Sequence, residues 1–237
     1  MTVPHDWAIY GPFSSLNDKQ EVAISQDGQK EAMEHAGRTG GLPFVGVGWY
    51  RTEFDVPQFQ AGKRATILFD GAMSHANVYI NGQKVGYWPY GYNSFHFDIT
   101  KYLKPGEKNT LAVRLENLPE SSRWYPGAGL YRNVHLIITE DAYIPVWGTY
   151  ITTPSVNEKF AKVNVRTKVV LPEGADPAKY SVETSVWNPN KQKLTAVRTS
   201  LAQMKYNNNQ AEQEFVIQAP SLWSPEMPAL YSAETRL

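Results

Sequence analysis

The sequence predicts an all-β protein built from two consecutive units, and three observations support this prediction. Short segments rich in β-branched and aromatic residues recur along most of the 237 residues, and turn residues separate them. Several segments alternate apolar and polar side chains, which is the period of a strand with one buried face. Asn81-Gly82 stands between two such segments. Asn-Gly is the strongest short hairpin signal because both central residues of that turn need a positive φ.

The first unit is expected to hold seven closely spaced strands. They are predicted at residues 49–56, 64–69, 76–80, 83–87, 94–99, 110–116 and 133–139. The clearest alternation places Leu111, Val113 and Leu115 on one face. Residues 18–35 break the pattern, because they are polar and contain few β-formers, so a short surface helix is expected there. Strands spaced this evenly predict a sandwich or a barrel.

The second unit begins near Ala142. Its strands are predicted at residues 146–151, 161–171, 180–187, 193–199, 212–217 and 230–236. About seven strands in about 95 residues fits an immunoglobulin-like sandwich. The expected domains are therefore residues 1–141 and residues 142–237.

Composition and charge exclude several functional classes. The chain carries 23 basic and 23 acidic residues, so no basic field attracts nucleic acid and no such partner is expected. It has no cysteine, which excludes disulfides and cysteine-based metal sites. No apolar run reaches the roughly 18 residues of a membrane span, so no membrane partner is expected. The first residues lack the features of a signal peptide, and the compartment stays open between bacterial cytoplasm and periplasm.

Four motifs in a fixed order carry a family resemblance. They are Val3-Pro4-His5-Asp6-Trp7, Gly48-Trp49-Tyr50-Arg51, the segment 123–132 (RWYPGAGLYR) and Leu222-Trp223-Ser224-Pro225. In this order and spacing, the first three resemble the sugar-binding jelly-roll domain of glycoside hydrolase family 2. The fourth resembles the end of that family's immunoglobulin-like second domain. The resemblance covers nearly the whole chain and implies a jelly-roll sandwich followed by an immunoglobulin-like sandwich.

The resemblance also implies what this chain does not contain. In the family a third domain, a (β/α)8 barrel, supplies two glutamates, and a retaining glycosidase holds such carboxyls about 5–5.5 Å apart. That barrel would begin where this chain ends, and a strand or more usually precedes the first motif. We therefore expect a non-catalytic N-terminal fragment of a β-galactosidase-type enzyme, with no catalytic residue and no activity alone. Asn157-Glu158 matches the family's acid/base dipeptide but lies in a polar hairpin loop, so a solvated turn is expected there.

Asp6 and His5 are the first candidate substrate-binding residues. The position that matches Asp6 reaches the sugar subsite in β-galactosidases of the family, where a short, fixed acceptor binds sugar hydroxyls. The alternative is a turn carboxylate beside a buried Trp7. His5 is adjacent and able to donate to a hydroxyl, although a lone histidine is more often structural. Asp70 and Asp98 are expected at strand ends, where carboxylates accept backbone N–H bonds.

Arg123 and Trp124 are the second pair of candidates, because this loop borders the active site in the family. Tryptophan stacks on the apolar face of a pyranose, and arginine binds hydroxyls or orients a carboxylate. The alternative is packing at a domain junction. Some family members carry a carboxylate just before this tryptophan that binds substrate or a metal ion. This chain has Ser121-Ser122-Arg123 there, so no metal or other cofactor is expected for the chain itself.

Other functions remain open from the sequence. A stand-alone carbohydrate-binding module would need an exposed aromatic strip, and the candidates are Trp49, Tyr50, Trp88, Tyr90 and Tyr92. A cell-surface interaction module would bind no sugar. Gly127 and Gly129 are no phosphate loop, because no helix signal follows them. The expected partners are a β-galactoside in the intact enzyme and the catalytic barrel, with β-glucuronidase or β-mannosidase relatives as the alternative.

Overall fold

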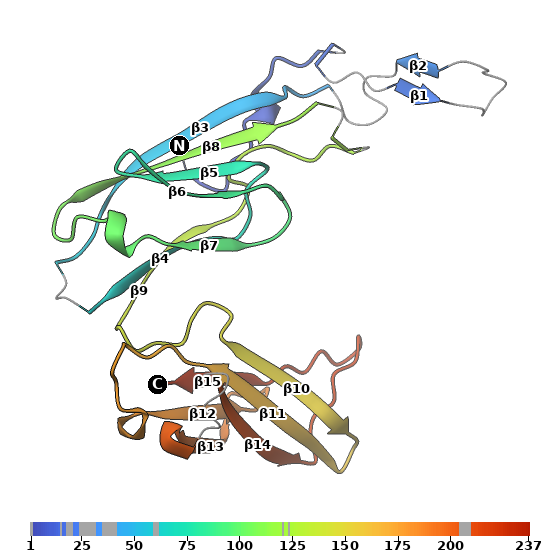
Figure 1. The fold of residues 1–237 in the computed structure, drawn as a ribbon. Helices are drawn as coiled ribbons and strands as arrows, with labels where there is room; N and C mark the ends of the chain where they lie inside the picture. Colours follow the sequence, from blue (N-terminus) through green and yellow to red (C-terminus); the bar gives the residue numbers. More distant parts are fainter. Residues whose placement is uncertain are drawn as a thin grey trace. The chain divides into compact units, whose positions relative to one another are not determined.

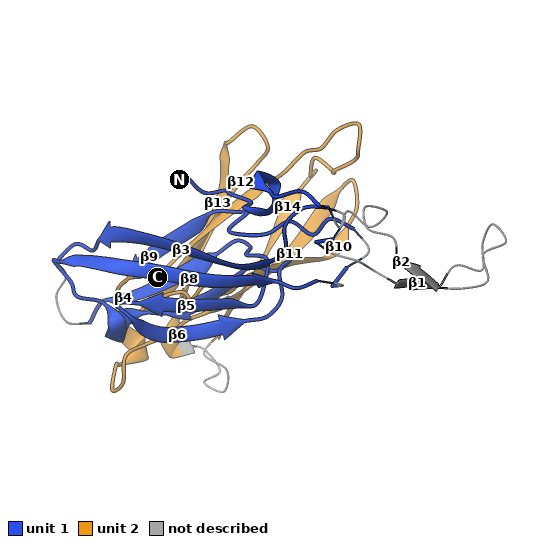
Figure 2. Cartoon of the chain, turned by 90° about the horizontal axis from the view of Figure 1, so that it is seen from above, with its two compact units in different colours: residues 1–138 blue, residues 139–237 orange. Residues whose placement is uncertain are grey.

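The computed structural model describes residues 2–14, 16–17, 21–23, 32–34, 42–58, 62–119, 121–122, 124–203 and 210–237. The chain divides into two compact units, residues 1–138 and 139–237 (Figure 2). Within the described ranges the only helices are four single 3-10 turns, so the all-β prediction is confirmed. None of the described helices is long and apolar enough to span a bilayer.

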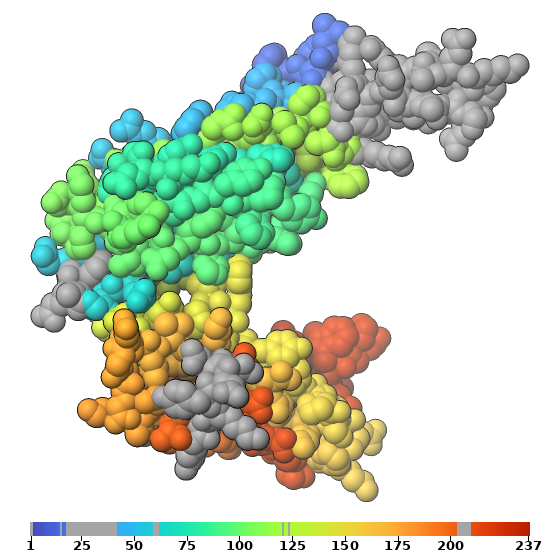
Figure 3. Space-filling model, in the orientation of Figure 1, coloured from blue at the N-terminus to red at the C-terminus, as the bar shows by residue number. Residues whose placement is uncertain are grey.

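Unit 1 is a sandwich of two sheets (Figure 1). The larger sheet contains, in spatial order, β3 (Gly46–Asp55), β8 (Lys108–Asn117), β5 (Ala76–Ile80) and β6 (Gln83–Trp88). The smaller sheet contains β7 (Phe95–Asp98), β4 (Arg64–Phe69) and β9 (Val134–Thr139). Two 3-10 turns, η1 (Ala8–Tyr10) and η2 (Thr100–Tyr102), belong to the same unit. In Figure 3 the face of this unit turned to the viewer is formed largely by the green residues of its middle part.

The core of unit 1 follows from the alternation of its strands. In β4, Ala65, Ile67 and Phe69 are buried, while the residues between them are only partly covered. They pack against buried side chains of the opposite sheet, among them Val78 and Val113. The aliphatic and aromatic side chains removed from water here supply the main driving force for folding.

The hairpin predicted at Asn81-Gly82 is confirmed, with φ values of 50° and 81°. A buried amide holds the neighbouring turn in place. Asn109 is fully buried, and its Oδ1 accepts hydrogen bonds from the Lys104 backbone N–H and from Nδ2 of Asn81, both at 2.8 Å.

The expectation for residues 18–35 is wrong where the structure describes them. Two short antiparallel strands, β1 (Glu21–Ala23) and β2 (Ala32–Glu34), lie there in place of a helix. The two strands pair through their backbones, and hydrophobic periodicity does not report such a pairing. The rest of that segment lies outside the described residues.

Unit 2 is also a sandwich of two sheets. One contains β10 (Thr149–Val156), β11 (Phe160–Lys168) and β14 (Gln210–Gln218). The other contains β13 (Lys193–Ser200), β12 (Ser181–Trp187) and β15 (Ser232–Arg236), in that order. The turns η3 (Pro177–Lys179) and η4 (Leu201–Gln203) complete the unit. The described part therefore has six strands, against the expectation of about seven.

Candidate functional site

Asp6 joins two segments of unit 1 that are far apart in the sequence. Its Oδ1 accepts hydrogen bonds from the backbone N–H of Ala8 at 2.9 Å and of Ala128 at 3.0 Å. Its Oδ2 accepts a hydrogen bond from the hydroxyl of Tyr125. Hydrogen bonds to an ionised group are roughly twice as strong as neutral ones, so the half-buried carboxylate fixes both loops.

Backbone pairing supports the same junction. The N–H of His5 donates to the carbonyl of Leu130 at 2.8 Å, and the N–H of Trp7 donates to that of Ala128 at 3.2 Å. Gly127, with φ of 74°, leaves room for the carboxylate, because a Cβ there would lie 3.2 Å from Asp6 Oδ2. Glycine adopts this backbone conformation without steric cost. The glycines of this loop therefore allow close approach to the Asp6 segment.

His5 is held by its neighbours on two sides. Its Nδ1 is 2.7 Å from the hydroxyl of Tyr50, and its ring stacks on Tyr10 with centroids 5.2 Å apart. Burial raises the pKa of Tyr50, whose side chain also packs against the core. These contacts give His5 a structural role in addition to any contact with a ligand.

Tyr125 was not singled out from the sequence, although it lies within a quoted motif. Burial raises its pKa, and the hydrogen bond to Asp6 and the negative charge of that carboxylate raise it further. The phenol therefore stays protonated and donates to Asp6. No periodicity links two residues separated by so much chain, so only the fold reveals this pair.

Trp124 lies beside Tyr125 and is exposed. Its Nε1 donates a 2.8 Å hydrogen bond to the hydroxyl of Tyr92, and its carbonyl accepts one from Ser122 Oγ, also at 2.8 Å. The structure thus brings Asp6, His5 and Trp124 to one loop region of unit 1. Arg123, the fourth predicted site residue, lies outside the described residues.

The aromatic strip considered from the sequence is not one surface. Tyr50 and Trp88 pack against the core of unit 1. Trp49 is exposed and lies beside Tyr79, with ring centroids 5.7 Å apart. Tyr90 and Tyr92 pack against each other with centroids 5.5 Å apart, and only this pair adjoins Trp124.

The other predicted carboxylates are structural. Asp98 Oδ1 accepts the Thr100 backbone N–H at 2.9 Å, as expected at a strand end. The Asp70 side chain contacts His135, with Oδ2 and Nε2 2.9 Å apart, so its described partner is a side chain of β9. The Asn157 side chain caps the turn between β10 and β11 by accepting the Lys159 N–H at 2.8 Å.

Among the described residues, no second carboxyl bonds to the Asp6 site. The described partners of Asp6 are two backbone N–H groups and a phenol, and glycoside hydrolysis requires two opposed carboxyls. Within the described ranges no three His, Cys, Asp or Glu residues cluster as metal ligands. Ser121 and Ser122, the described residues shortly before Trp124 in the chain, carry no carboxylate that would bind a metal ion.

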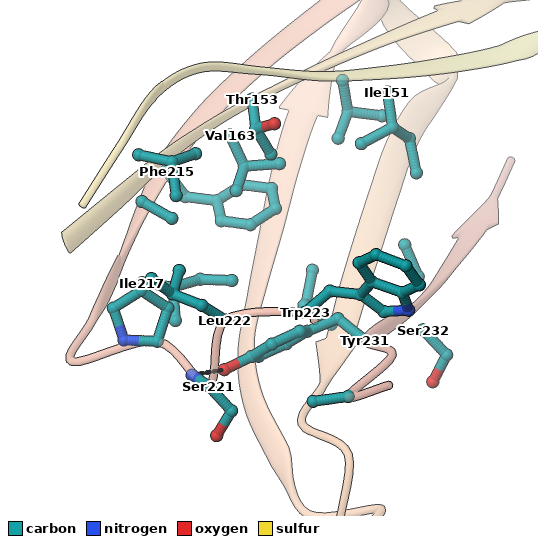
Figure 4. A pocket seen from close by; sticks show the side chains of 17 residues that line it. Ile151, Thr153, Val163, Phe215, Ile217, Ser221, Leu222, Trp223, Tyr231 and Ser232 are labelled. Carbon is teal, nitrogen blue, oxygen red and sulfur yellow. Dashed lines mark hydrogen bonds between the residues drawn. The ribbon is translucent and has the colours of Figure 1, made fainter. Parts of the chain in front are cut away.

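The described residues also line a groove in unit 1 and a cavity in unit 2. A groove of about 420 Å³ in unit 1 is lined by residues that include Tyr50, Thr52 and Val134. A cavity of about 300 Å³ lies inside unit 2 (Figure 4). Trp223 and Tyr231 lie across it from Val163 and Phe215, and the Tyr231 hydroxyl accepts the Ser221 N–H at 2.8 Å. Its lining is almost wholly apolar, so it presents no set of catalytic groups.

Two protein-family models match the chain, one over strands β3 to β9 of unit 1 and the other over the strands of unit 2. Residues 42–140 match the model described as "Glycosyl hydrolases family 2, sugar binding domain". Residues 143–237 match the model described as "Glycosyl hydrolases family 2". The two sandwiches are thus the expected jelly roll and immunoglobulin-like domain.

Individual relatives agree with the family match. Beta-galactosidase BoGH2A of Bacteroides ovatus is 38% identical over 238 residues, which cover 100% of this chain and 26% of that protein. A putative beta-glucuronidase of Formosa agariphila is 34% identical and matches 100% of this chain but 20% of its own length. A solved structure of a glycosyl hydrolase family 2 member from Bacteroides cellulosilyticus has a TM-score of 0.78 and 29% identity, with 100% of this chain and 29% of that chain covered.

The chain therefore spans about a quarter of the length of these relatives. It is homologous to the N-terminal region of family 2 β-galactosidases and β-glucuronidases. On the motifs, the two sandwiches and these matches, the chain belongs to glycoside hydrolase family 2.

Proposed function

We propose that the chain is the non-catalytic N-terminal part of a retaining β-galactosidase-type glycosidase, in which it lends Asp6 to the sugar subsite. The observation that carries the proposal is the geometry of this carboxylate. Three hydrogen bonds fix it, and about four acceptor positions are available on a carboxylate, so one position remains for a sugar hydroxyl. A fixed acceptor binds without losing side-chain entropy.

Trp124, His5 and Arg123 are the further residues proposed to contact the bound substrate. Trp124 is exposed, so its ring is free to stack on a pyranose of that substrate, while His5 has one ring nitrogen engaged by Tyr50. The negative charge of Asp6 favours neutral hydroxyl donors over the carboxylate of a uronic acid, because like charges repel. This charge and the two motifs favour a galactoside over a glucuronide.

A second proposed role of the chain is to support the catalytic barrel. Unit 1 exposes several large apolar side chains near its N-terminus, which we call the N-terminal apolar patch: Ile9, Phe13, Leu16, Leu42, Phe44 and Val47. Its two segments touch, because the Ser14 N–H donates to the Leu42 carbonyl at 3.0 Å. Contiguous exposed apolar surface of this kind marks a protein interface.

The test replaces Asp6 in the full-length enzyme that contains this chain. We expect Asp6→Ala to lower kcat/KM for a nitrophenyl β-galactoside by about 10- to 100-fold, the range of a lost hydrogen bond to a charged group. Asp176→Ala is the matched control, because Asp176 also caps a backbone N–H, that of Ala178 at 3.0 Å, but in unit 2.

Asp6→Asn separates binding from folding, because it keeps an oxygen for the two N–H groups. Its melting temperature should stay near that of the wild type while kcat/KM falls. Full activity of both Asp6 variants would contradict the subsite role. Turnover of the galactoside by the isolated 237-residue chain would contradict the non-catalytic assignment.

A further inference from the structure

Three exposed aromatic side chains from two loops adjoin the Asp6 site, and we call them the aromatic platform. Tyr90, Tyr92 and Trp124 are 52%, 41% and 59% exposed. The Trp124 indole N–H donates to the Tyr92 hydroxyl at 2.8 Å, which joins the two loops. The Tyr90 and Tyr92 rings meet edge to face, at 62°. These contacts make one continuous surface from three separate rings.

The loop that carries the two tyrosines is fixed from beneath. Gly91 lies between them and is buried, and its carbonyl accepts the Tyr131 hydroxyl at 2.7 Å. A Cβ at Gly91 would lie 2.3 Å from Met73 Sδ, so the backbone packs directly on that side chain. Rings already held in place lose little entropy when a ligand binds.

The platform combines apolar ring faces with polar edges. The Tyr92 hydroxyl accepts the indole N–H, so its own proton is left to donate outward. Among the described residues, none has a hydrogen bond to the Tyr90 hydroxyl. A pyranose offers the complementary arrangement, an apolar C–H face ringed by hydroxyls. The N-terminal apolar patch has mostly aliphatic side chains and phenylalanine rings, which suit a protein partner better.

We propose that the aromatic platform binds a second pyranose, next to the sugar at Asp6, and that the substrate class is therefore an oligosaccharide. The proposal rests on the proposed function for the position of the first sugar. Tyr125 provides the link, because it donates to Asp6 and directly follows Trp124 in the chain. A chain of sugar units thus has consecutive contacts along one edge of unit 1.

The test titrates the 237-residue chain with β-1,4-galactotetraose and with methyl β-galactoside, followed by calorimetry and tryptophan fluorescence. The tetraose should bind more tightly than the monosaccharide. Trp124→Ala and Tyr90→Ala should each weaken tetraose binding about three- to tenfold, the scale of one aromatic contact. Tyr92→Phe keeps the ring but removes the acceptor of the indole N–H, so it should have a smaller effect in the same direction.

Trp49→Ala is the matched control, because Trp49 is 60% exposed on β3 and lies outside the platform. It should leave tetraose binding unchanged. Equal losses for Trp49→Ala and Trp124→Ala, or no tetraose binding by the wild-type chain, would overturn the proposal, and the platform would then be a contact surface for another domain. The titration needs no barrel and no turnover, so its failure is distinct from failure of the Asp6 test.

Discussion

The two units share a sandwich architecture but gather their polar side chains in different places. In unit 1 the Asp6 carboxylate and the Tyr125, Tyr92 and Trp124 side chains meet on loops, where a ligand can reach them. In unit 2 the main polar cluster is internal. Gln213 is 3% exposed, accepts the Thr184 hydroxyl at 2.6 Å and donates to backbone carbonyls of the opposite sheet.

This difference distinguishes side chains that are available to a ligand from side chains that hold the two sheets together. A buried, fully bonded amide such as Gln213 specifies how two sheets pack, but it has no group left for a partner. A loop carboxylate with an unused acceptor position still has a group that can bind a partner. The comparison fits the ligand contact proposed for unit 1, and it gives the Gln213 amide of unit 2 a structural role.

Substitution of a closely packed glycine should cause the largest loss in the free energy of unfolding. At Gly48 in β3 a Cβ would lie 2.3 Å from the Trp7 ring, whereas at Gly174 in unit 2 no atom lies within 4 Å. Gly48→Ala must displace the Trp7 ring and, with it, the Asp6 segment. We expect a loss of about 3 kcal/mol in the free energy of unfolding of unit 1, the upper range for overpacking.

Gly174→Ala is the matched control, and it should cost about 1 kcal/mol because Gly174 has a positive φ of 74°. Hydrogen exchange measured by mass spectrometry resolves the two units separately. Equal destabilisation by the two variants would show that close packing at the Asp6 segment is not what distinguishes unit 1.

The sequence predicts the regular part of both units and misses the contacts between loops. The alternation in 64–69 and the Asn81-Gly82 turn are local signals, so strand and hairpin are found where expected. Asp6 and Trp124 were candidates through the family resemblance. Their contacts were not predicted: Tyr125 was no candidate, and Tyr92 was considered only as part of an aromatic strip, because a hydrogen bond between distant loops leaves no period in the sequence. The strands β1 and β2 were missed for another reason, because both are short and their segment contains few β-formers.

Enlarging a buried alanine should change the free energy of unfolding by a smaller amount, and in opposite directions in the two units. Ala161 is buried and lines the cavity of unit 2, so Ala161→Val adds apolar contacts in available space. We expect it to stabilise unit 2 by about 1 kcal/mol. Ala65 is fully buried in the core of unit 1, and Ala65→Val should destabilise that unit by about 1–3 kcal/mol through overpacking.

Denaturant unfolding of the two valine variants measures both expected changes in stability. Both substitutions add the same two methyl groups to a strand, so intrinsic β propensity does not explain a difference in sign. Destabilisation of unit 2 by Ala161→Val would mean that its cavity closes in solution.

Alkaline pH should cause the smallest change in stability, and it should lower the stability of unit 1 through ionisation of Tyr125. Burial and the bond to Asp6 raise its pKa in the folded state above the value of about 10 expected for an unfolded chain. The folded state therefore holds the proton more tightly. The stabilisation is complete below about pH 10 and is lost as the pH rises above that value toward the folded-state pKa.

Tyr125→Phe removes this dependence while keeping the ring. Because Tyr125 is 38% exposed, solvent screening should reduce the effect to less than about 1 kcal/mol per pH unit. The measurement is the urea midpoint of the wild type and of Tyr125→Phe from about pH 8 to about pH 11. The wild type should be the more stable protein at the lower pH, where its phenol still donates to Asp6, and the gap should narrow as the phenol ionises. Two parallel curves would mean that the bond between Tyr125 and Asp6 does not hold the loops together, and the contrast drawn between the units would lose its central contact.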